Sequence, residues 1–300
     1  MKILITGGTG FVGSGVSHRL LELGHEVTAI GSSSRCRLPD HPQLTYVAAD
    51  TTRPGDWQQR VADQDALINL AGRSIFNLWT TAYKEVLYNS RILTTRNLVD
   101  ALPANSEAVL LSTSAAGFYG DGGETEKTED SSGGTDFLAR VCRDWEGEAG
   151  KAAAKGARVV MMRFGVVLGK GGGAIATMKT PFQLGLGGPI GSGNQWFPWI
   201  HRDDLIGALL FLLSAEESRG PFNFTAPEPV RQKDFARQLG AALHRPAFLP
   251  TPAFVMKLVL GEFGRSLLQG QKVLPGALTV SGYQFTYPAL PPALKDIIGD

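Results

Sequence analysis

The sequence predicts an α/β protein, a Rossmann-type doubly wound parallel sheet followed by a smaller mixed C-terminal lobe. The first observation is that short apolar runs alternate with helical patterns through the first half of the chain. The second is a glycine-rich turn that joins the first such run, Lys2–Thr6, to the first helical pattern. The third is a change after residue 168, where loops rich in glycine, proline and aromatic residues replace the regular alternation.

The composition is that of a globular protein and excludes several classes of function. The chain has 300 residues, of which 43% are hydrophobic and 19% charged, and a net charge of +1 favours neither nucleic acid nor a membrane as partner. Cys36 and Cys142 belong to no ligand cluster, so no metal site is predicted. Because the chain begins with a strand rather than a signal peptide, we expect a cytoplasmic protein. A small molecule is the expected substrate. The sequence does not indicate an oligomeric state.

Six apolar runs predict the parallel strands. Lys2–Thr6 is a β-branched apolar run of the kind found in buried parallel strands, and the later runs share its character. Right-handed crossovers between such strands place ligands at their carboxyl ends. The remaining runs are His25–Ile30, Leu44–Ala48, Asp65–Leu70, Ala108–Ser112 and Ala157–Phe164.

Apolar residues at helical spacing predict the connecting helices. Ser14–Leu23 ends at Gly24, and two longer patterns, Trp79–Leu102 and Phe137–Lys155, follow the fourth and fifth strands. The polar stretch 120–135 is interpreted as an exposed loop. The later predicted elements are helices Leu205–Leu213 and Lys233–Leu243, strand Phe222–Thr225, and the segments Pro250–Gly261 and Pro292–Ile298.

This order of elements predicts how the chain divides. Residues 1–168 and about 200–226 form the dinucleotide-binding domain, and residues from about 169 to 199 and 227 to 300 form the substrate-binding lobe.

The glycine-rich turn predicts a dinucleotide site. A strand, a glycine turn and a helix in this order let a pyrophosphate approach the backbone and the free N–H groups of the helix. A glycine-rich turn in some other α/β protein is the alternative. The predicted cofactor contacts in the turn are Gly7, Gly8, Thr9, Gly10, Phe11, Val12 and Gly13.

The end of the second strand predicts which cofactor binds. A free ribose 2′-hydroxyl usually meets an acidic residue at this point, whereas the chain has Gly-Ser-Ser-Ser-Arg-Cys-Arg at positions 31–37. An arginine can hold a 2′-phosphate through charge-assisted hydrogen bonds, so Ser32 and Arg35 favour NADP(H) over NAD. A solvated loop with incidental arginines is the alternative.

Several motifs extend along the whole chain. They are TGGTGFVG, Asp50 after the third strand, NLAG at positions 69–72, SRxxxT at 90–95, RFGVVLGKGGG at 163–173, LGLGGPIGSG at 184–193 and FPWIH at 197–201. In these motifs the chain resembles the extended short-chain dehydrogenase/reductases, and more closely an atypical subgroup labelled the epimerase family, sometimes cell-division inhibitors. The resemblance implies that Asp50 meets the adenine, that Leu70, Ala71 and Gly72 lie along the ribose and pyrophosphate, and that Arg163 contacts the cofactor.

The chain departs from this superfamily at its acid–base pair. The superfamily usually carries a Tyr four residues before a Lys, and the Lys lowers the pKa of the phenol for proton transfer. None of the six tyrosines here precedes a lysine at that spacing. Leu138 and Cys142 align with the pair, with Glu146 as the anchor of the alignment.

Two residues remain as catalytic candidates, and one arginine as a further ligand contact. Ser114 matches the substrate-binding hydroxyl of the superfamily and can polarise a carbonyl, or it simply caps the strand end. Tyr119 is the second candidate, or an aromatic residue packed under a loop. Arg91 replaces an Asn of the superfamily and can hold a cofactor phosphate or a substrate anion, with a surface ion pair as the alternative.

The segment Gly187–His201 predicts a wall of the substrate site. Its glycines permit movement, and Trp196, Trp199 and His201 are the predicted substrate contacts, unless they only join the two lobes. Together these features predict an NADP-dependent oxidoreductase or epimerase that acts on a small polar molecule in the interlobe cleft. The alternative is a non-catalytic regulatory protein that senses NADP(H).

Overall fold

Seven parallel strands form the central sheet of the computed structural model, which describes residues 1–299. The strand order is β11-β7-β5-β4-β1-β2-β3, and every pairing in it is parallel. The strands are β1 (Lys2–Thr6), β2 (Glu26–Gly31), β3 (Leu44–Ala48), β4 (Ala66–Asn69), β5 (Val109–Ala115), β7 (Arg158–Phe164) and β11 (Gly220–Phe224). This arrangement confirms the predicted Rossmann-type fold.

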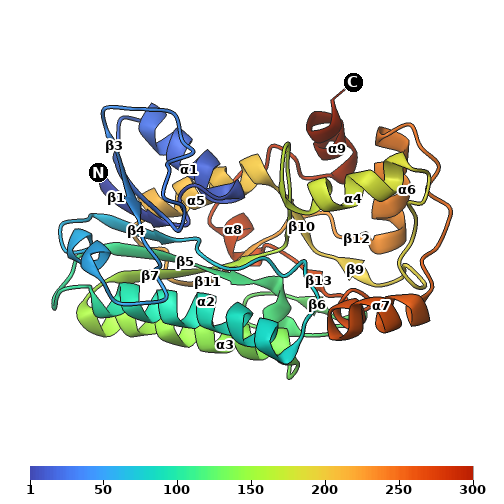
Figure 1. Cartoon of the computed structure of the whole chain (residues 1–300), viewed down its shortest axis with the longest axis horizontal. Helices are drawn as coiled ribbons and strands as arrows, with labels where there is room; N and C mark the ends of the chain where they lie inside the picture. The colour runs from blue at the N-terminus through green and yellow to red at the C-terminus, as the bar shows by residue number, and fades with distance from the viewer. Residues whose placement is uncertain (300) are drawn as a thin grey trace.

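Helices cover both faces of the sheet (Figure 1). On one face, α1 (Phe11–Glu22) and α5 (Arg202–Ser214) share a core with Ile3 and Ile5 of β1. On the other face, Leu4 packs in the core that also holds Leu98 of α2 (Thr81–Asp100) and Ala149 of α3 (Phe137–Gly150). Successive residues of a strand point to opposite faces, and both faces are covered here, which is why Ile3, Leu4 and Ile5 are all apolar.

The C-terminal lobe has a hydrophobic core of its own, which includes Trp199, Phe235 and Leu294. Figure 1 shows the lobe beside the carboxyl ends of the strands, with α7 at its lower edge. Its elements are β8 (Val166–Leu168), α4 (Gly173–Gln183), β9 (Trp196–Phe197), β10 (Trp199–His201), β12 (Val230–Arg231), α6 (Gln232–Ala242), α7 (Ala253–Ser266) and α9 (Leu290–Ile298).

The remaining elements are short. They are three 3-10 helices, η1 (Asp56–Arg60), η2 (Ala116–Tyr119) and η3 (Lys151–Lys155), two strands, β6 (Glu126–Lys127) and β13 (Lys272–Val273), and helix α8 (Gly276–Val280).

The structure corrects several predicted elements. The stretch 120–135 is not purely a loop, because β6 pairs in parallel with β13 from the C-terminal region. Helix α7 extends past the predicted end at Gly261, where a φ of +57° breaks the helical path. Helix α4 was not predicted, since a glycine-rich loop directly precedes it and Pro181 lies inside it. Leu278 of α8 packs in the core of the sheet, so part of the segment assigned to the lobe belongs with the sheet.

In residues 1–299, no helix combines the length and the apolar character that crossing a membrane requires.

Candidate functional site

The glycine turn between β1 and α1 has the backbone conformation that its glycines require. Gly7 has a φ of +71°, and its N–H donates to the carbonyl of Ile30 at 2.8 Å, which ties the turn to β2. A Cβ at Gly13 would collide with the carbonyl oxygen of Gly7. Gly13 therefore allows α1 to start directly against the turn.

The space above this turn is open at Gly10. A Cβ at Gly10 would meet only the Gly7 oxygen, at 3.2 Å, so a larger side chain would extend into open space over the turn. Gly10 is also the N-cap of α1 and supplies no side chain to the first N–H groups of the helix. Free N–H groups at a helix start favour an anion, which is consistent with the prediction of cofactor contacts from Gly7 to Gly13.

Phe11 and Val12 occupy the first turn of α1, and the side chain of Phe11 packs against the loop before α4. Its ring fills the space that side chains at Gly172 and Gly173 would need, so the glycines of RFGVVLGKGGG allow the loop before α4 to pack on α1. The ring thus joins the lobe to the sheet.

The turn after β4 lies directly against the glycine turn. A Cβ at Gly7 would come within 3.0 Å of the backbone of Leu70 and Ala71. Gly72 leaves room for Arg91, whose guanidinium carbon would lie 3.4 Å from a Cβ at that position. The predicted cofactor contacts Leu70, Ala71 and Gly72 therefore form one continuous edge with the turn.

The side chain of Asn69 holds this edge in place. Its Oδ1 accepts from Thr6 Oγ1 at 2.6 Å, and its Nδ2 donates to Thr95 Oγ1 at 2.7 Å. Trp145 Nε1 also donates to Thr95 Oγ1, at 2.8 Å. This buried network explains physically why NLAG and SRxxxT occur together in the sequence.

The residues that were predicted to select the cofactor lie at the exposed ends of β2 and β3. Ser32 and Arg35 are exposed, and Arg35 forms no ion pair with a carboxylate in residues 1–299. The neighbouring loop is anchored by Tyr46, whose hydroxyl donates to the carbonyl of Ser33 at 2.6 Å. The carboxylate of Asp50 accepts from Thr52 Oγ1 at 2.6 Å, and this bond holds the pKa of Asp50 below its usual value.

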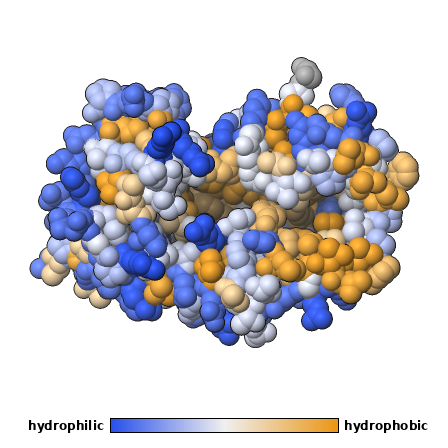
Figure 2. Space-filling view, in the orientation of Figure 1, coloured by the Kyte–Doolittle hydropathy of each residue, from blue (hydrophilic) through white to orange (hydrophobic). Residues whose placement is uncertain are grey.

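A largely apolar cavity of about 410 Å³ lies between the sheet domain and the lobe. Figure 2 shows the face of the molecule that is hollowed between these two parts. Three of the predicted site residues line the cavity, namely Ser114, Arg91 and Trp196. None of the lining residues within 1–299 is acidic. Sequence analysis missed Arg73, Thr113, Phe137, Phe263 and Leu267 as further lining residues.

Ser114 is held by a buried carboxylate. Its Oγ lies 2.6 Å from Oε1 of Glu146, and because a carboxylate only accepts hydrogen bonds, the serine hydroxyl is the donor. The oxygen of Ser114 can then accept a hydrogen bond from a ligand but has no second proton to donate. The predicted polarisation of a carbonyl by Ser114 does not fit this arrangement.

Arg163 belongs to the same buried cluster. Nε and Nη2 bond the two oxygens of Glu146 at 2.8 and 2.9 Å, and only 4% of Arg163 is exposed. Burial alone would lower the pKa of Arg163, but the bonds to Glu146 outweigh burial and raise it. The predicted cofactor contact of Arg163 does not fit this position, since the guanidinium is enclosed by protein.

Tyr119 lies behind the cavity rather than in it. Its hydroxyl donates to Asn223 Oδ1 at 2.6 Å and accepts from Arg163 Nη1 at 2.9 Å, and 3% of the residue is exposed. Burial raises the pKa of Tyr119. The predicted catalytic role is therefore not supported, and the alternative of an aromatic residue packed under a loop describes its position.

Leucine and cysteine occupy the two positions where the superfamily has its Tyr and Lys. Both positions face the cavity, but neither residue can act as an acid or a base at neutral pH. Leu138 and Cys142 both line the cavity from α3. Burial, with the charge of Glu146, raises the pKa of the Cys142 thiol to about 12, so the thiol stays protonated and inert.

The aromatic segment divides into residues that line the cavity and residues that do not. Trp196 lines it, and the guanidinium of Arg231 lies 3.7 Å from the centre of the Trp196 ring. Trp199 is 1% exposed in the core of the lobe, so the predicted substrate contact was wrong for this residue. The two residues differ because β10 pairs with β8 and directs Trp199 into the lobe.

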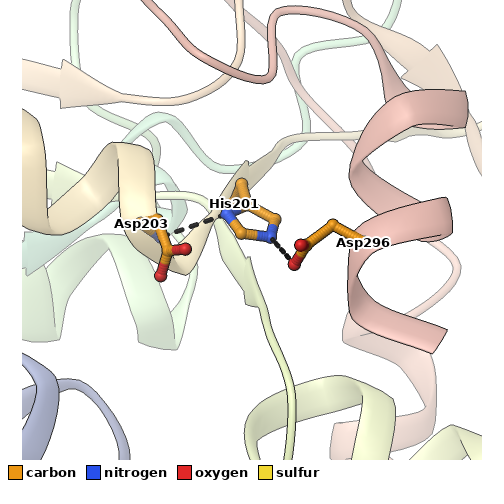
Figure 3. A group of neighbouring side chains, drawn as sticks. All are labelled: His201, Asp203 and Asp296. Atoms are coloured by element: carbon orange, nitrogen blue, oxygen red, sulfur yellow. Dashed lines mark hydrogen bonds and ion pairs between the residues drawn. The ribbon is translucent and has the colours of Figure 1, made fainter. Parts of the chain in front are cut away.

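His201 caps a helix instead of binding substrate (Figure 3). Its Nδ1 accepts from the N–H of Asp203 at 3.1 Å, and its Nε2 faces Asp296 of α9 at 3.4 Å. Ligand atoms of these three residues lie within 4.8 Å of one another, but Figure 3 shows the two carboxylates on opposite sides of the ring. We therefore interpret the group as the N-cap of α5 and a tie to α9.

The His201 cap predicts a pH dependence of stability. Burial lowers the pKa of His201 in the folded state, although the neighbouring carboxylates of Asp203, Asp296 and Asp204 oppose that shift. The folded state then binds fewer protons than the unfolded state. His201 therefore contributes to the free energy of unfolding above the unfolded pKa of about 6.5, and this contribution is lost as the pH falls below that value. His201→Asn, which retains a capping oxygen and does not titrate, should flatten the slope of the free energy of unfolding against pH by up to about 1.4 kcal/mol per pH unit as the pH falls below ~6.5. Urea unfolding of both proteins across this range measures the difference, and parallel pH profiles would contradict the assignment.

Comparison with known proteins identifies the family. The model of the NAD dependent epimerase/dehydratase family matches residues 3–224, and a domain of unknown function, DUF1731, matches residues 251–297. The chain is 40% identical to an Arabidopsis thaliana protein, "Epimerase family protein SDR39U1 homolog, chloroplastic", over 99% of this chain and 87% of that protein. It is also 40% identical to the mouse epimerase family protein SDR39U1, over 99% of this chain and 100% of the mouse protein.

A solved structure supports the same relationship. The human epimerase family protein SDR39U1, whose crystal structure was determined with NADPH, superposes with a TM-score of 0.86 at 36% identity, over 99% of both chains. The chain therefore belongs to the NAD dependent epimerase/dehydratase family, and within it to the atypical short-chain dehydrogenase/reductases of the SDR39U1 type.

Proposed function

We propose that this chain binds NADP(H) and is an oxidoreductase for a small molecule held in the interlobe cavity. The observation that carries the proposal is the position of the cavity. Thr113, Ser114 and Ala115, at the carboxyl end of β5, line it, and Phe164 lines it at the end of β7. This is the edge of a Rossmann sheet where the nicotinamide half of the cofactor belongs. The human relative with NADPH supports the choice of cofactor.

Different segments of the chain bind different parts of NADPH. The glycine turn from Gly7 to Gly13 and the start of α1 hold the pyrophosphate, the turn Leu70–Gly72 borders the ribose, and Ser32 with Arg35 holds the 2′-phosphate. NADPH, when bound, supplies a hydride. Ser114 accepts a hydrogen bond at the nicotinamide end, and the apolar walls from α3 and α7 exclude water from the cavity.

The geometry favours a plain hydride transfer over epimerisation. An epimerase of this superfamily needs a base that removes a hydroxyl proton from its sugar substrate, and that base is the Tyr–Lys pair. Here Leu138 and Cys142 stand at those positions, and the thiol of Cys142 is a poor base. The substrate of this chain therefore takes its proton from water or needs none from the protein.

The same two residues support a second candidate function, a regulatory protein that senses the redox state of NADP(H) without turnover. One experiment separates the two functions. The protein is incubated with NADPH deuterated at C4 and a small-molecule extract, and the products are examined by mass spectrometry. An oxidoreductase accumulates NADP⁺ and a deuterium-labelled product, whereas a sensor leaves the label on the cofactor and binds the two redox forms with different affinities.

Arg35 gives a prediction for cofactor choice. In wild-type protein we expect NADPH to bind about tenfold to hundredfold more tightly than NADH, because a charge-assisted contact to the 2′-phosphate contributes about 1.5–3 kcal/mol. Arg35→Ala should weaken NADPH binding to near the NADH value and leave NADH binding unchanged. Isothermal titration calorimetry measures all four affinities. Arg37→Ala, in the same exposed loop, is the matched control. If only Arg37→Ala weakened NADPH binding, Arg37 rather than Arg35 would contact the 2′-phosphate.

A further inference from the structure

We propose that the cavity receives a small, flat, apolar molecule with one carboxylate or similar anionic group, and that Arg91 binds this group. The inference rests on the proposed function, because it concerns the substrate end of the same cleft. It departs from the polar substrate that the sequence predicted.

Arg91 is a cation that lacks a counter-charge. Its Nη1 donates to the carbonyl of Leu87 at 3.0 Å and its Nη2 to the carbonyl of Arg73 at 3.0 Å, so two neutral groups fix its orientation. It forms no ion pair in residues 1–299, whereas Arg96, farther along the same helix, bonds Glu148 at 2.7 Å.

The surroundings of Arg91 make a bound anion favourable. Burial lowers the pKa of the guanidinium, because a charge withdrawn from water without a partner loses solvation free energy. One side faces the Trp145 ring, with 5.3 Å from the guanidinium carbon to the ring centre. The remaining N–H donors can bind a carboxylate in the fork geometry that arginine favours.

The charged side chains that line the cavity are all positive. Two arginines, Arg73 and Arg91, line it, and the lining residues among 1–299 include no aspartate or glutamate. An uncompensated positive potential inside walls of low polarity attracts an anion and disfavours a cation.

The walls beyond Arg91 are apolar. Phe137, Leu138, Val141 and Trp145 line the cavity from α3, and Phe263 and Leu267 line it from the region of α7. The ring of Trp79 holds this wall together, with ring centres 5.5 Å from both Phe137 and Phe263. Flat aromatic surfaces favour a flat apolar ligand, and Ser266, Gln269 and Gln271, which also line the cavity, can bond its polar group.

The volume limits the ligand further. Under the proposed function, the roughly 410 Å³ must hold the nicotinamide end of the cofactor as well as the ligand. The volume that the cofactor leaves for the ligand favours a small molecule, such as a phenyl ring with a short acid chain.

Cinnamate and its neutral counterpart cinnamyl alcohol test this inference as probes. Both are titrated by calorimetry into the full-length protein, with and without saturating NADPH. We expect wild-type protein to bind cinnamate at least about tenfold more tightly than the alcohol, the effect of one charge-assisted hydrogen-bonded pair. Arg91→Gln should abolish this preference, and Arg91→Lys should retain part of it. Arg96→Gln, whose parent side chain pairs with Glu148 instead, should leave the preference unchanged.

Separate outcomes would overturn the inference and the proposed function. Equal affinities for the two probes in wild-type protein, or binding of neither, would overturn the anion site. A loss of NADPH affinity in folded Arg91→Gln that matches the loss for cinnamate would assign Arg91 to the cofactor instead. Failure of wild-type protein to bind NADPH would contradict the proposed function alone, because the probe preference is also measured without NADPH.

Discussion

Glu146→Ala is expected to lower the free energy of unfolding by about 3–5 kcal/mol, the usual cost of removing one partner from a buried ion pair. Its carboxylate bonds two nitrogens of Arg163, at 2.8 and 2.9 Å, and the hydroxyl of Ser114 at 2.6 Å. The substitution leaves the guanidinium of Arg163 charged and largely enclosed. Urea unfolding followed by circular dichroism measures the loss.

A double substitution is the control for this prediction. Glu146→Leu with Arg163→Met removes both charges and keeps apolar volume in their place, so it should be markedly more stable than Glu146→Ala. A loss of less than about 1 kcal/mol in Glu146→Ala would contradict the description of this pair as buried and essential to the fold.

Gly10→Val is expected to reduce NADPH affinity by at least about hundredfold while the protein stays folded. The backbone of Gly10 is extended, with a φ of −76°, so a side chain causes no strain there. Its Cβ would meet one backbone oxygen, at 3.2 Å, and the branched methyl groups would fill the space over the turn that a pyrophosphate needs. Calorimetric titration with NADPH, beside a circular dichroism spectrum, measures both properties.

Gly13→Val is the contrasting variant for Gly10. A Cβ at Gly13 collides with the turn itself, so this substitution should destabilise the fold and not only the binding. Folded Gly10→Val that still binds NADPH with wild-type affinity would place the phosphates away from this turn.

The sheet could be predicted from the sequence because its signals are local. The structure confirms Lys2–Thr6 and Leu44–Ala48 as strands with the predicted ends, since each is a short apolar run between turns. The start of α1 was predicted three residues late, because glycine at position 13 disfavours a helix in isolation. Close packing on Gly7 requires that glycine nevertheless.

The glycine turn was predictable, whereas the arrangement of charged residues behind the cleft was not. A glycine turn needs only neighbours in sequence, whereas the position of Arg163 depends on β7 lying beside β5, with Arg163 paired to Ser114. That register brings the guanidinium to Glu146 of α3, and no spacing along the chain indicates it. Trp196 and Trp199 likewise look equivalent in sequence, and only the pairing of β10 with β8 separates them.

The apolar character of the cavity also depends on distant segments. Phe137 and Phe263 are more than one hundred residues apart in the chain, yet Trp79 contacts both rings. Neither residue stands in a motif. Local sequence patterns therefore predict the glycine turn, whereas the lining of the substrate cavity depends on segments that only the folded structure brings together.

Hydrogen–deuterium exchange with and without saturating NADPH tests most directly whether the cofactor spans the glycine turn and reaches the interlobe cavity. We predict slower exchange in two separate segments, residues 7–13 at the start of α1 and residues 113–117 at the end of β5, with α6 and α9 unchanged. Protection of residues 113–117 reports the nicotinamide end, since they line the cavity. NADPH binding that slows exchange in neither segment, or only outside them, would contradict the proposed site.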